Sequence, residues 1–263
     1  MTFIDTHTHL YDEAFDADRE AALQRAREAG VETLLLPDID SAIRPRQQAF
    51  AAAHPGCTRQ MAGLHPTSVK ADWEAELQQV QALLFGTGPS PEDAGPYIAV
   101  GEVGMDLYWD RTFEAEQREA LRRQLRWAQE LGLPVCLHIR KAHNEVFALL
   151  REMNRPAWRG VMHCFGGSVQ EARRATEMGF HLGIGGVVTF KNAGMADVVR
   201  ETPLERLLLE TDAPYLSPVP HRGKRNESAY LPLVAAKVAE LKGISVEEVA
   251  EATTASAREL FAL

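Results

Sequence analysis

Short apolar runs alternate with longer amphipathic segments along the whole chain. The apolar runs have the length of strands, and the segments between them place apolar residues three and four positions apart, as in helices. The runs predicted to be strands lie at 3–10, 31–37, 58–66, 97–106, 134–140, 159–165, 180–186 and 204–212. Nearly continuous apolar strands that alternate with helices are typical of a parallel sheet covered on both faces. Eight strand-and-helix units in a chain of 263 residues therefore predict an α/β fold, the closed (β/α)8 TIM barrel.

The helix signals agree with this pattern and predict one helix more than the barrel needs. Apolar residues of 114–131 share one face of a helix. Near the end of the chain, Ser245 and Glu248 have the spacing of a capping box, which predicts an extra C-terminal helix. The segment 86–96 is rich in glycine and proline and predicts a surface loop rather than a linker. We therefore expect residues 1–263 to form a single barrel domain.

Composition and charge narrow the functions that the barrel could have. The chain contains 28 Lys and Arg and 37 Asp and Glu, for a formal net charge of −9. Extended binding of nucleic acid needs many clustered cations, so an anionic substrate has to be held locally. No apolar run approaches the roughly 20 residues that cross a bilayer, and the first residues do not resemble a secretory signal. The three cysteines are widely spaced, as is typical of free thiols in a reducing compartment, so we expect a cytoplasmic protein. We expect no membrane association and infer no obligate protein partner.

Ionisable residues recur where the predicted strands end. In a parallel barrel the carboxyl ends of all strands meet at one rim, and barrel enzymes build their active sites there. The residues at these ends are His7, His9, His65, Glu102, His138, His163 and Asp212. We therefore expect these side chains to lie close together around the mouth of the barrel.

Most of these residues also have an ordinary structural explanation. His7 and His9 are two positions apart in a predicted strand, so both face the barrel mouth, but such pairs also occur without a metal. His138 and His163 lie in apolar strands, where a single histidine is more often a hydrogen-bonded core residue. Asp212 could also cap a helix or a turn. Only their joint occurrence favours a functional site.

Glu102 stands near two glycines, Gly101 and Gly104, which we expect to leave room for a ligand beside the backbone. Several carboxylates and imidazoles in one low-dielectric mouth need a compensating cation. Imidazole and carboxylate ligands suit Zn²⁺, Mn²⁺, Fe²⁺ or Co²⁺. Six ligands exceed what one open catalytic ion needs, so we expect two divalent metal ions that share Glu102. The predicted ligands are His7, His9, Glu102, His138, His163 and Asp212.

The order of these motifs resembles that of the TatD-related metal-dependent deoxyribonucleases of the amidohydrolase superfamily. The matching blocks are FIDTHTHL at 3–10, GLHP at 63–66, GEVGMD at 101–106, LHIRKA at 137–142, MHCFGGS at 162–168, LETDAPYLSP at 209–218 and HRGKRNESAYL at 221–231. The blocks extend over nearly the whole chain in the order typical of the family, which is far more specific than any single motif.

The resemblance implies a (β/α)8 barrel with a divalent-metal centre formed by the same six residues, and cytoplasmic hydrolysis of phosphodiester bonds in DNA, often from a 3′ end. We accordingly expect DNA, as single strands or 3′ ends, to be the substrate. Two divalent ions drawn from Zn, Mn, Mg, Fe or Co are the expected cofactors. In the expected mechanism a metal-bound hydroxide attacks phosphorus, Glu102 bridges the ions and Asp212 accepts the proton. Asp212 and Glu102 are therefore the predicted catalytic residues.

Local cations are expected to hold the phosphate. The predicted substrate-binding residues are His65, Arg140, Arg222, Lys224 and Arg225. Arg140 lies two residues after His138 on the same face of a predicted strand, and the last three belong to the basic run RGKR after the eighth strand. Lys191 is a weaker candidate. The basic run could also be an ordinary solvated loop.

Two other classes of function use the same residues. A metal-activated water can hydrolyse another ester or an amide, as in an aminoacyl-tRNA deacylase, a lactonase or an amidase. The basic run and Arg140 favour a phosphate backbone over a neutral ester. A non-catalytic metal-binding or nucleic-acid-binding barrel has no need for Glu102 and Asp212 beside an open metal position.

Overall fold

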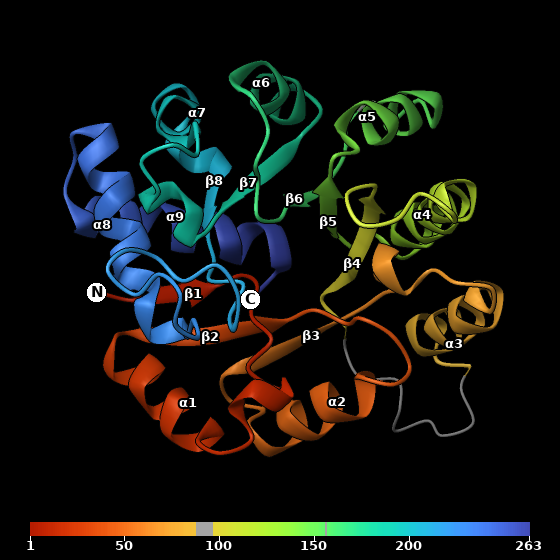
Figure 1. Cartoon of the computed structure of the whole chain (residues 1–263), viewed down its shortest axis with the longest axis horizontal. Helices are drawn as coiled ribbons and strands as arrows, with labels where there is room; N and C mark the ends of the chain where they lie inside the picture. Colours follow the sequence, from red (N-terminus) through yellow and green to blue (C-terminus); the bar gives the residue numbers. More distant parts are fainter. Residues whose placement is uncertain (88–96, 156) are drawn as a thin grey trace.

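Eight parallel strands follow one another around a barrel in the order of the chain (Figure 1). The computed structural model describes residues 1–87, 97–155 and 157–263, so most of the loop predicted at 86–96 lies outside the described residues. The strands are β1 Phe3–Asp5, β2 Val31–Leu36, β3 Thr58–Ala62, β4 Ala99–Asp106, β5 Val135–Arg140, β6 Gly160–Met162, β7 Phe180–Ile184 and β8 Leu207–Leu209. The last strand joins the first through the amide of Thr6, which donates to the carbonyl of Leu209 at 3.1 Å. The predicted (β/α)8 barrel is confirmed.

A helix follows each strand, and one more helix ends the chain. The helices are α1 Arg19–Glu28, α2 Arg44–Ala53, α3 Trp73–Phe85, α4 Glu114–Leu131, α5 His143–Glu152, α6 Val169–Glu177, α7 Met195–Glu201, α8 Leu231–Lys242 and α9 Val246–Phe261. The bounds of α4 match the prediction, and Ser245 and Glu248 form the expected capping box before α9. Among the described residues, no helix is both long and apolar enough to cross a membrane.

The extra helix α9 closes the barrel at the end where the strands begin. Residues on seven of the strands form one apolar cluster with Leu260 and Phe261 of this helix. The strand residues are Ile4, Leu35, Met61, Ala99, Cys136, Val161 and Leu208. The hydroxyls of Thr254 and Ser256 donate to the carbonyls of Thr2 and Glu205, which precede β1 and β8. Because this end is plugged, the interior of the barrel opens at the carboxyl ends of the strands.

Several strands end earlier than the apolar pattern predicts. β1 ends at Asp5 and β8 at Leu209, and residues 204–206 form a short 3-10 helix. His7, His9 and Asp212 therefore lie in the loops that follow, where the backbone bonds to other loops; the amide of His9, for example, donates to Ala213 at 2.8 Å. The prediction that His7 and His9 belong to a strand is wrong, because the pairing of β1 with β2 ends at Asp5 and the amide of His9 bonds to the loop after β8 instead.

The space beside the two glycines of β4 is filled by the neighbouring strand. A Cβ atom on Gly104 would lie 1.8 Å from the carbonyl oxygen of His138, and one on Gly101 would lie 2.6 Å from Cβ of Cys136. The prediction that these glycines leave room for a ligand is wrong. They let β4 and β5 approach each other, which brings Glu102 and His138 together.

Candidate metal centre

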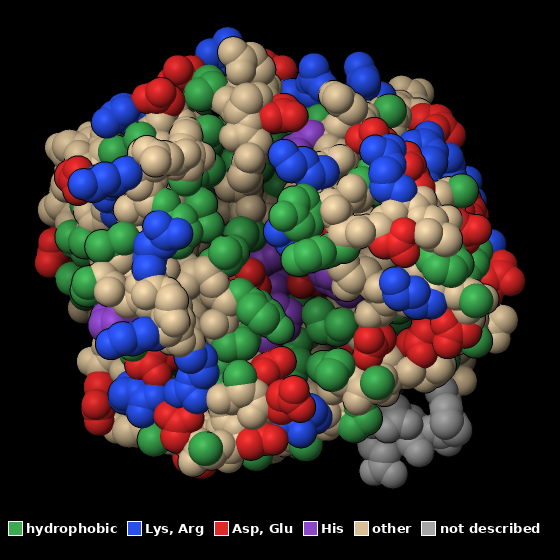
Figure 2. Space-filling model, in the orientation of Figure 1, with side chains coloured by type: hydrophobic (Ala, Val, Ile, Leu, Met, Phe, Trp, Pro, Cys, Tyr) green, Lys and Arg blue, Asp and Glu red, His purple; other side chains and the backbone are tan. Residues whose placement is uncertain are grey.

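A hollow of about 1060 Å³ opens at the carboxyl ends of the strands (Figure 2). Figure 2 looks into this hollow, with histidine side chains visible at its floor and hydrophobic side chains around it. Its lining includes His9, His65, Glu102, His138, His163 and Asp212. His7 is fully buried and contacts Glu102 and His9. The structure therefore brings together all the ionisable residues that were placed at strand ends.

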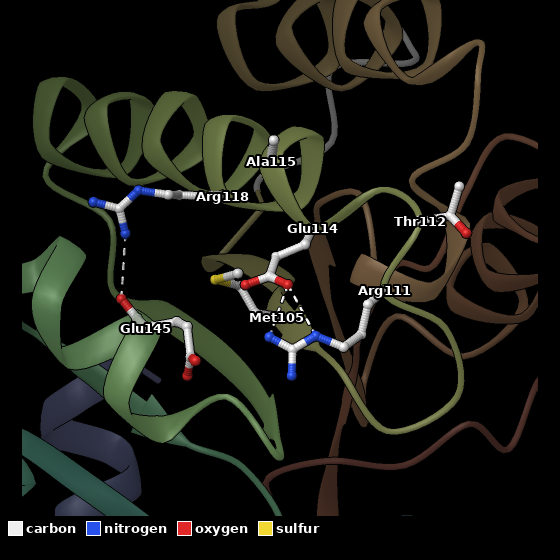
Figure 3. A pocket seen from close by; sticks show the side chains of 7 residues that line it. All are labelled: Met105, Arg111, Thr112, Glu114, Ala115, Arg118 and Glu145. Atoms are coloured by element: carbon white, nitrogen blue, oxygen red, sulfur yellow. Dashed lines mark hydrogen bonds and ion pairs between the residues drawn. The ribbon is translucent and has the colours of Figure 1, made fainter.

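A second hollow, of about 510 Å³, lies beside β4 at α4 and α5 (Figure 3). Both of its arginines are engaged: Arg111 pairs with Glu114 at 2.8 Å, and Arg118 pairs with Glu152 and donates to the backbone carbonyl of Glu145 at 3.4 Å. No group of three metal-ligating side chains occurs there among the described residues. The chemistry is therefore concentrated in the larger hollow.

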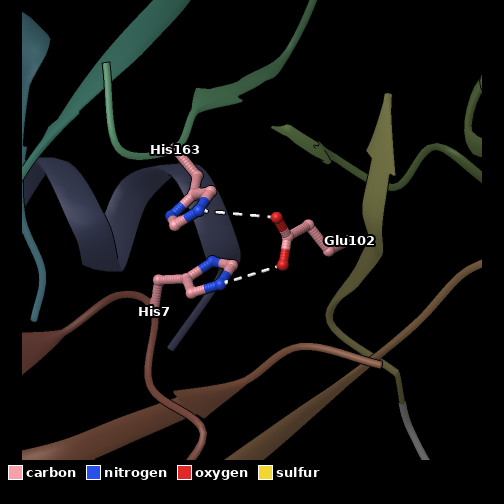
Figure 4. A group of neighbouring side chains, drawn as sticks. All are labelled: His7, Glu102 and His163. Carbon is pink, nitrogen blue, oxygen red and sulfur yellow. Dashed lines mark ion pairs between the residues drawn. The ribbon is translucent and has the colours of Figure 1, made fainter. Parts of the chain in front are cut away.

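Glu102 lies at the centre of the cluster, and its two carboxylate oxygens face different histidines (Figure 4). Oε2 lies 3.1 Å from Nε2 of His7, whereas Oε1 lies 3.4 Å from Nε2 of His163 and 2.7 Å from Nδ1 of His138. The Glu102 side chain is buried on β4. One carboxylate thus contacts ring nitrogens through both of its oxygens, and the rings of His7 and His163 stack on each other with their centroids 3.5 Å apart.

His9 and Asp212 complete the group on the Oε2 side. The Nε2 atoms of His7 and His9 are 3.2 Å apart, and Oδ1 of Asp212 lies 3.8 Å and 3.5 Å from them. Asp212 has a φ of 57°, a left-handed conformation that few residues with a side chain adopt. Its amide donates to the carbonyl of His7 at 2.9 Å, which fixes this backbone. Such strain is concentrated at functional sites.

Tyr11 determines which nitrogen of His9 points into the cluster. The Tyr11 hydroxyl donates its proton to the carbonyl of Pro37, at 2.5 Å, and lies 2.7 Å from Nδ1 of His9. Since a hydroxyl has one proton, Tyr11 accepts from Nδ1–H of His9. The lone pair of neutral His9 is then on Nε2, the atom that faces His7 and Asp212. This is the tautomer that a metal ligand needs.

Two carboxylates orient His138 and His163 in a similar way. Oδ2 of Asp106 lies 3.0 Å from Nε2 of His138, which favours the proton there and leaves the lone pair on Nδ1, beside Glu102. Oε1 of Glu210 lies 3.1 Å from Nδ1 of His163, and although the pair does not meet hydrogen-bond geometry, its charge favours a proton on Nδ1 and leaves Nε2 facing Glu102. A carboxylate behind the ring is typical of metal-ligating histidines.

The three orienting residues were not identified from the sequence. Tyr11 follows His9 by two positions, Asp106 follows Glu102 by four, and Glu210 precedes Asp212 by two. Asp106 and Glu210 lie within the same blocks and Tyr11 directly follows the first block, which is the one available signal. It does not show which ring each residue contacts, because that depends on loop geometry after the strand ends.

The charges of the cluster fit a bound cation. Burial lowers the pKa of His163, but Glu210, Glu102 and Asp212 outweigh this effect and raise it to about 10, so a proton occupies on Nε2 the position that a divalent cation would take. Burial disfavours ionisation of Glu102, yet His65, His163 and His7 hold its pKa well below the usual range. These carboxylates therefore need positive charge beside them. Divalent cations supply that charge and bind imidazoles through their lone pairs, so the nitrogen and oxygen donors of this cluster suit them.

His65 contacts the cluster as a hydrogen-bond donor. Its Nδ1 accepts from the amide of Thr67 at 3.1 Å, so the proton of the neutral ring is on Nε2. Nε2 lies 3.3 Å from Oε1 of Glu102 and 3.2 Å from Nδ1 of His138. A donor at this place suits a carboxylate or phosphate oxygen better than a metal ion. The predicted substrate-binding role of His65 remains a proposal.

The predicted phosphate-binding residues do not all reach the hollow. Arg140 lines it, together with Lys141, but Arg222, Lys224 and Arg225 are not part of its lining. The guanidinium of Arg222 lies over the ring of Phe190, 4.2 Å from its centroid. Arg225 donates to both carboxylate oxygens of Asp18, at 2.6 Å and 2.8 Å.

The comparisons with known proteins agree with this geometry. The sequence model of the TatD related DNase family matches residues 4–262. The metal-dependent hydrolase YabD of Bacillus subtilis is 38% identical over 98% of this chain and 98% of its own length. A protein of Pantoea ananatis described as the 3′-5′ ssDNA/RNA exonuclease TatD is 34% identical over 98% of this chain and 99% of its own.

A solved structure extends the similarity to three dimensions. The crystal structure of YjjV, a TatD homologue of Escherichia coli, superposes with a TM-score of 0.89 at 34% identity, covering 99% of this chain and 98% of that one. The resemblance noted in the sequence blocks is therefore confirmed over essentially the full barrel. The chain belongs to the TatD-related DNase family of metal-dependent hydrolases.

Proposed function

We propose that this protein hydrolyses phosphodiester bonds of DNA, in single strands or at 3′ ends, with two divalent metal ions. The observation that carries the proposal is the position of Glu102, whose two oxygens face different groups of imidazoles. The proposed ligands on one side are His7, His9 and Asp212, and on the other His138 and His163, with Glu102 shared. All three cysteines are free, which agrees with the proposed cytoplasmic location.

Divalent ions at such a site supply a water molecule of lowered pKa and offset the charge of a phosphate. The exposure of the Asp212 side chain supports it as the proposed proton acceptor, because it is 14% exposed and borders the hollow, whereas the Glu102 side chain is 2% exposed. Burial opposes ionisation, but His163, His9 and His7 hold the pKa of Asp212 below its usual value. The group is therefore ionised and able to act as a base.

His65 and Arg140 are the proposed contacts to the scissile phosphate. His65 presents an N–H group beside Glu102, and Arg140 lies on the wall of the hollow. Arg222 and Lys224 lie outside this lining, so we propose that they contact nucleic acid only beyond the hollow. Arg225 is held by Asp18 and is left out of the proposed substrate-binding set.

Hydrolysis of another ester or an amide remains the alternative that has to be tested. The basic run RGKR, which in the sequence favours a phosphate backbone, does not line the hollow. Arg140 and Lys141 are the lysine and arginine side chains in the described lining of the hollow, so they are the proposed source of selectivity for phosphate over carboxyl esters. The metal ligands alone suit either reaction.

A substrate panel separates these activities. Purified protein is supplied in turn with Zn²⁺, Mn²⁺, Mg²⁺ or Co²⁺ and incubated with single-stranded DNA, duplex DNA, RNA, aminoacylated tRNA and simple esters, with and without a chelator. We expect chelator-sensitive release of mononucleotides from the 3′ ends of single-stranded DNA. Turnover of esters or aminoacyl-tRNA without nuclease activity would contradict the proposal.

A further inference from the structure

Exposed large hydrophobic side chains gather around the mouth of the hollow. In the described part of the chain these side chains are Met1, Tyr108, Trp109, Tyr215, Leu216 and Val219. All except Met1 lie in two loops, after β4 and after β8. Trp109, Tyr215 and Leu216 line the hollow itself, and Trp109 is 71% exposed. Large apolar side chains that gather at an opening in this way mark a binding surface.

The two loops stand on opposite sides of the mouth. The strand order follows the chain around the barrel, so β4 and β8 are four strands apart in either direction. Trp109 therefore lies on one wall and Tyr215 on the other. The Tyr215 ring reaches the proposed metal ligands, with its centroid 6.0 Å from that of His9. We call Tyr108, Trp109 and Tyr215 the aromatic rim.

The wall after β8 is fixed although its tyrosine is exposed. The Tyr215 amide donates to the carbonyl of Asp212 at 2.8 Å. Asn226 is fully buried, and its side-chain amide donates to the carbonyls of Thr211 and Tyr215, both at 2.7 Å. The Tyr215 ring is thus held on a constrained backbone before any ligand arrives, which lowers the entropic cost of binding.

On the wall after β4, the guanidinium of Arg140 packs against two aromatic rings. The Tyr108 amide donates to Oδ1 of Asp106 at 3.0 Å. The guanidinium of Arg140 lies 4.0 Å from the centroid of the Tyr108 ring and 5.1 Å from that of Trp109. Because Arg140 lines the hollow, a flat group and a phosphate can be bound side by side on this wall.

Charge alone does not explain how this hollow could hold a polyanion. Of the described residues that line it, Arg140 and Lys141 are the lysine and arginine side chains, and Asp12, Glu145 and Glu171 also line it. The whole chain has a formal net charge of −9. Stacking on aromatic side chains binds every base without requiring positive charge, and contributes to binding in single-strand-binding proteins.

We propose that the aromatic rim binds unpaired nucleobases by stacking while Arg140 contacts the adjoining phosphate. The rim thereby selects single-stranded nucleic acid, because the ring faces of a duplex are covered by neighbouring bases. The proposal rests on the proposed DNA hydrolysis for its substrate class. The aromatic rim would bind the bases, which the metal ligands do not contact.

Binding to two oligonucleotides of equal backbone charge tests the rim. The first is a thymidine octamer with cleavage-resistant phosphorothioate linkages, and the second is the same backbone without bases. Affinity for metal-loaded protein is measured by fluorescence anisotropy of labelled oligonucleotides. The variants are Trp109→Ala, Tyr215→Ala, Trp109→Phe and Tyr215→Phe. Val219→Ala is the matched control, because Val219 is 47% exposed in the same loop as Tyr215 but does not line the hollow.

We expect the wild type to bind the thymidine octamer about 5- to 100-fold more tightly than the abasic octamer. Each alanine variant removes one stacking ring, so it should lose part of this preference for the thymidine octamer while its affinity for the abasic octamer changes by less than about 2-fold. The phenylalanine variants and Val219→Ala should retain most of the affinity. Equal binding of both octamers by the wild type, or an equal loss of both in the alanine variants, would overturn the proposal.

Two further outcomes distinguish base stacking on the rim from nuclease activity and from self-association. A preference for the thymidine octamer that falls in the alanine variants supports base stacking on the rim even if the protein hydrolyses no DNA. Failure of the proposed hydrolysis is therefore recognised separately from failure of the rim proposal. Sedimentation of the wild type and of Trp109→Ala tests self-association. A dimer that dissociates in Trp109→Ala would assign the rim to contact with a second copy and overturn the proposal.

Discussion

Oδ2 of Asp106 lies 3.0 Å from Nε2 of His138, on the side of the imidazole opposite to the atom that faces Glu102. The other carboxylate oxygen of Asp106 accepts from the amide of Tyr108. One carboxylate therefore fixes both a proposed metal ligand and the start of the aromatic rim. Burial opposes its ionisation, but the bonds from His138 and Tyr108 keep its pKa below the usual value.

The first prediction concerns the charge of Asp106. Asp106→Asn keeps the shape of the side chain but no longer stabilises a proton on Nε2 of His138. We expect metal affinity and kcat to fall about 10- to 100-fold, as for other residues that orient metal-binding histidines. Competition with a chromophoric chelator measures the affinity, and excess metal should restore part of the activity.

Asp110→Asn is the matched control for this substitution. Asp110 lies in the same loop and bonds to Thr112 instead of a histidine. Its replacement should leave metal affinity unchanged. Unchanged metal affinity in Asp106→Asn as well would show that His138 is oriented without this carboxylate.

A second prediction separates metal binding from proton transfer. Glu102→Gln removes the carboxylate that both groups of histidines share, so we expect the purified variant to hold less metal than the wild type. Asp212→Asn should remain folded and lose about 10²- to 10⁴-fold in kcat, the contribution typical of a general base. Elemental analysis gives the metal content, and circular dichroism checks the fold. Asp212→Asn that turns over at the wild-type rate when replete with metal would exclude Asp212 as the base.

The barrel and the group of residues at its mouth could be predicted because both depend on local pattern. The alternation of apolar runs and helices determines the strand order, and the order places Glu102, His138 and Asp212 at one rim. The orientation of each side chain could not be predicted. It depends on loops such as the one that carries His9, whose hydrogen bonds join segments far apart in the chain.

The position of the basic run could not be predicted from the sequence either. Arg222, Lys224 and Arg225 follow the last strand closely enough to be expected at its mouth. The intervening loop turns back on itself: Asn226 donates from its amide to the carbonyl of Pro214, at 2.9 Å. The Arg and Lys side chains of the run therefore lie outside the lining of the hollow. No periodic pattern in the sequence predicts this turn of the loop.

A third prediction tests Arg140 as the phosphate contact. Arg140→Ala should raise KM for single-stranded DNA and make the dependence of log KM on log salt shallower by about 0.7, the value for one phosphate contact. Arg140→Lys keeps the charge and should keep the slope, although it weakens the stack on Tyr108 and Trp109. Lys224→Ala, outside the hollow, should change the slope less than Arg140→Ala. A slope that Arg140→Ala leaves unaltered would exclude the contact.

The last prediction concerns Arg225 as a stabilising residue. Hydrogen bonds from Arg225 and Arg25 hold the pKa of Asp18 well below its usual value near 4. The folded protein thus binds this proton less readily than the unfolded chain, so the pair stabilises the fold above about pH 4 and the contribution is lost as the pH falls further. Both side chains are partly exposed, and such pairs contribute about 0.2–1 kcal/mol.

Arg225→Ala should therefore lower the unfolding midpoint at pH 7 by about 1–4 °C, and the difference from the wild type should shrink below about pH 4. Asp18→Asn should behave in the same way, since it removes the other half of the pair. Arg222→Ala is the control, because Arg222 contacts the ring of Phe190 and carries no ion pair in the described structure. Thermal unfolding followed by circular dichroism at several pH values measures the effect. An Arg225→Ala variant with an unchanged midpoint and a raised KM for DNA would instead make Arg225 a substrate contact, because its ion pair with Asp18 would then have to open when the phosphate binds.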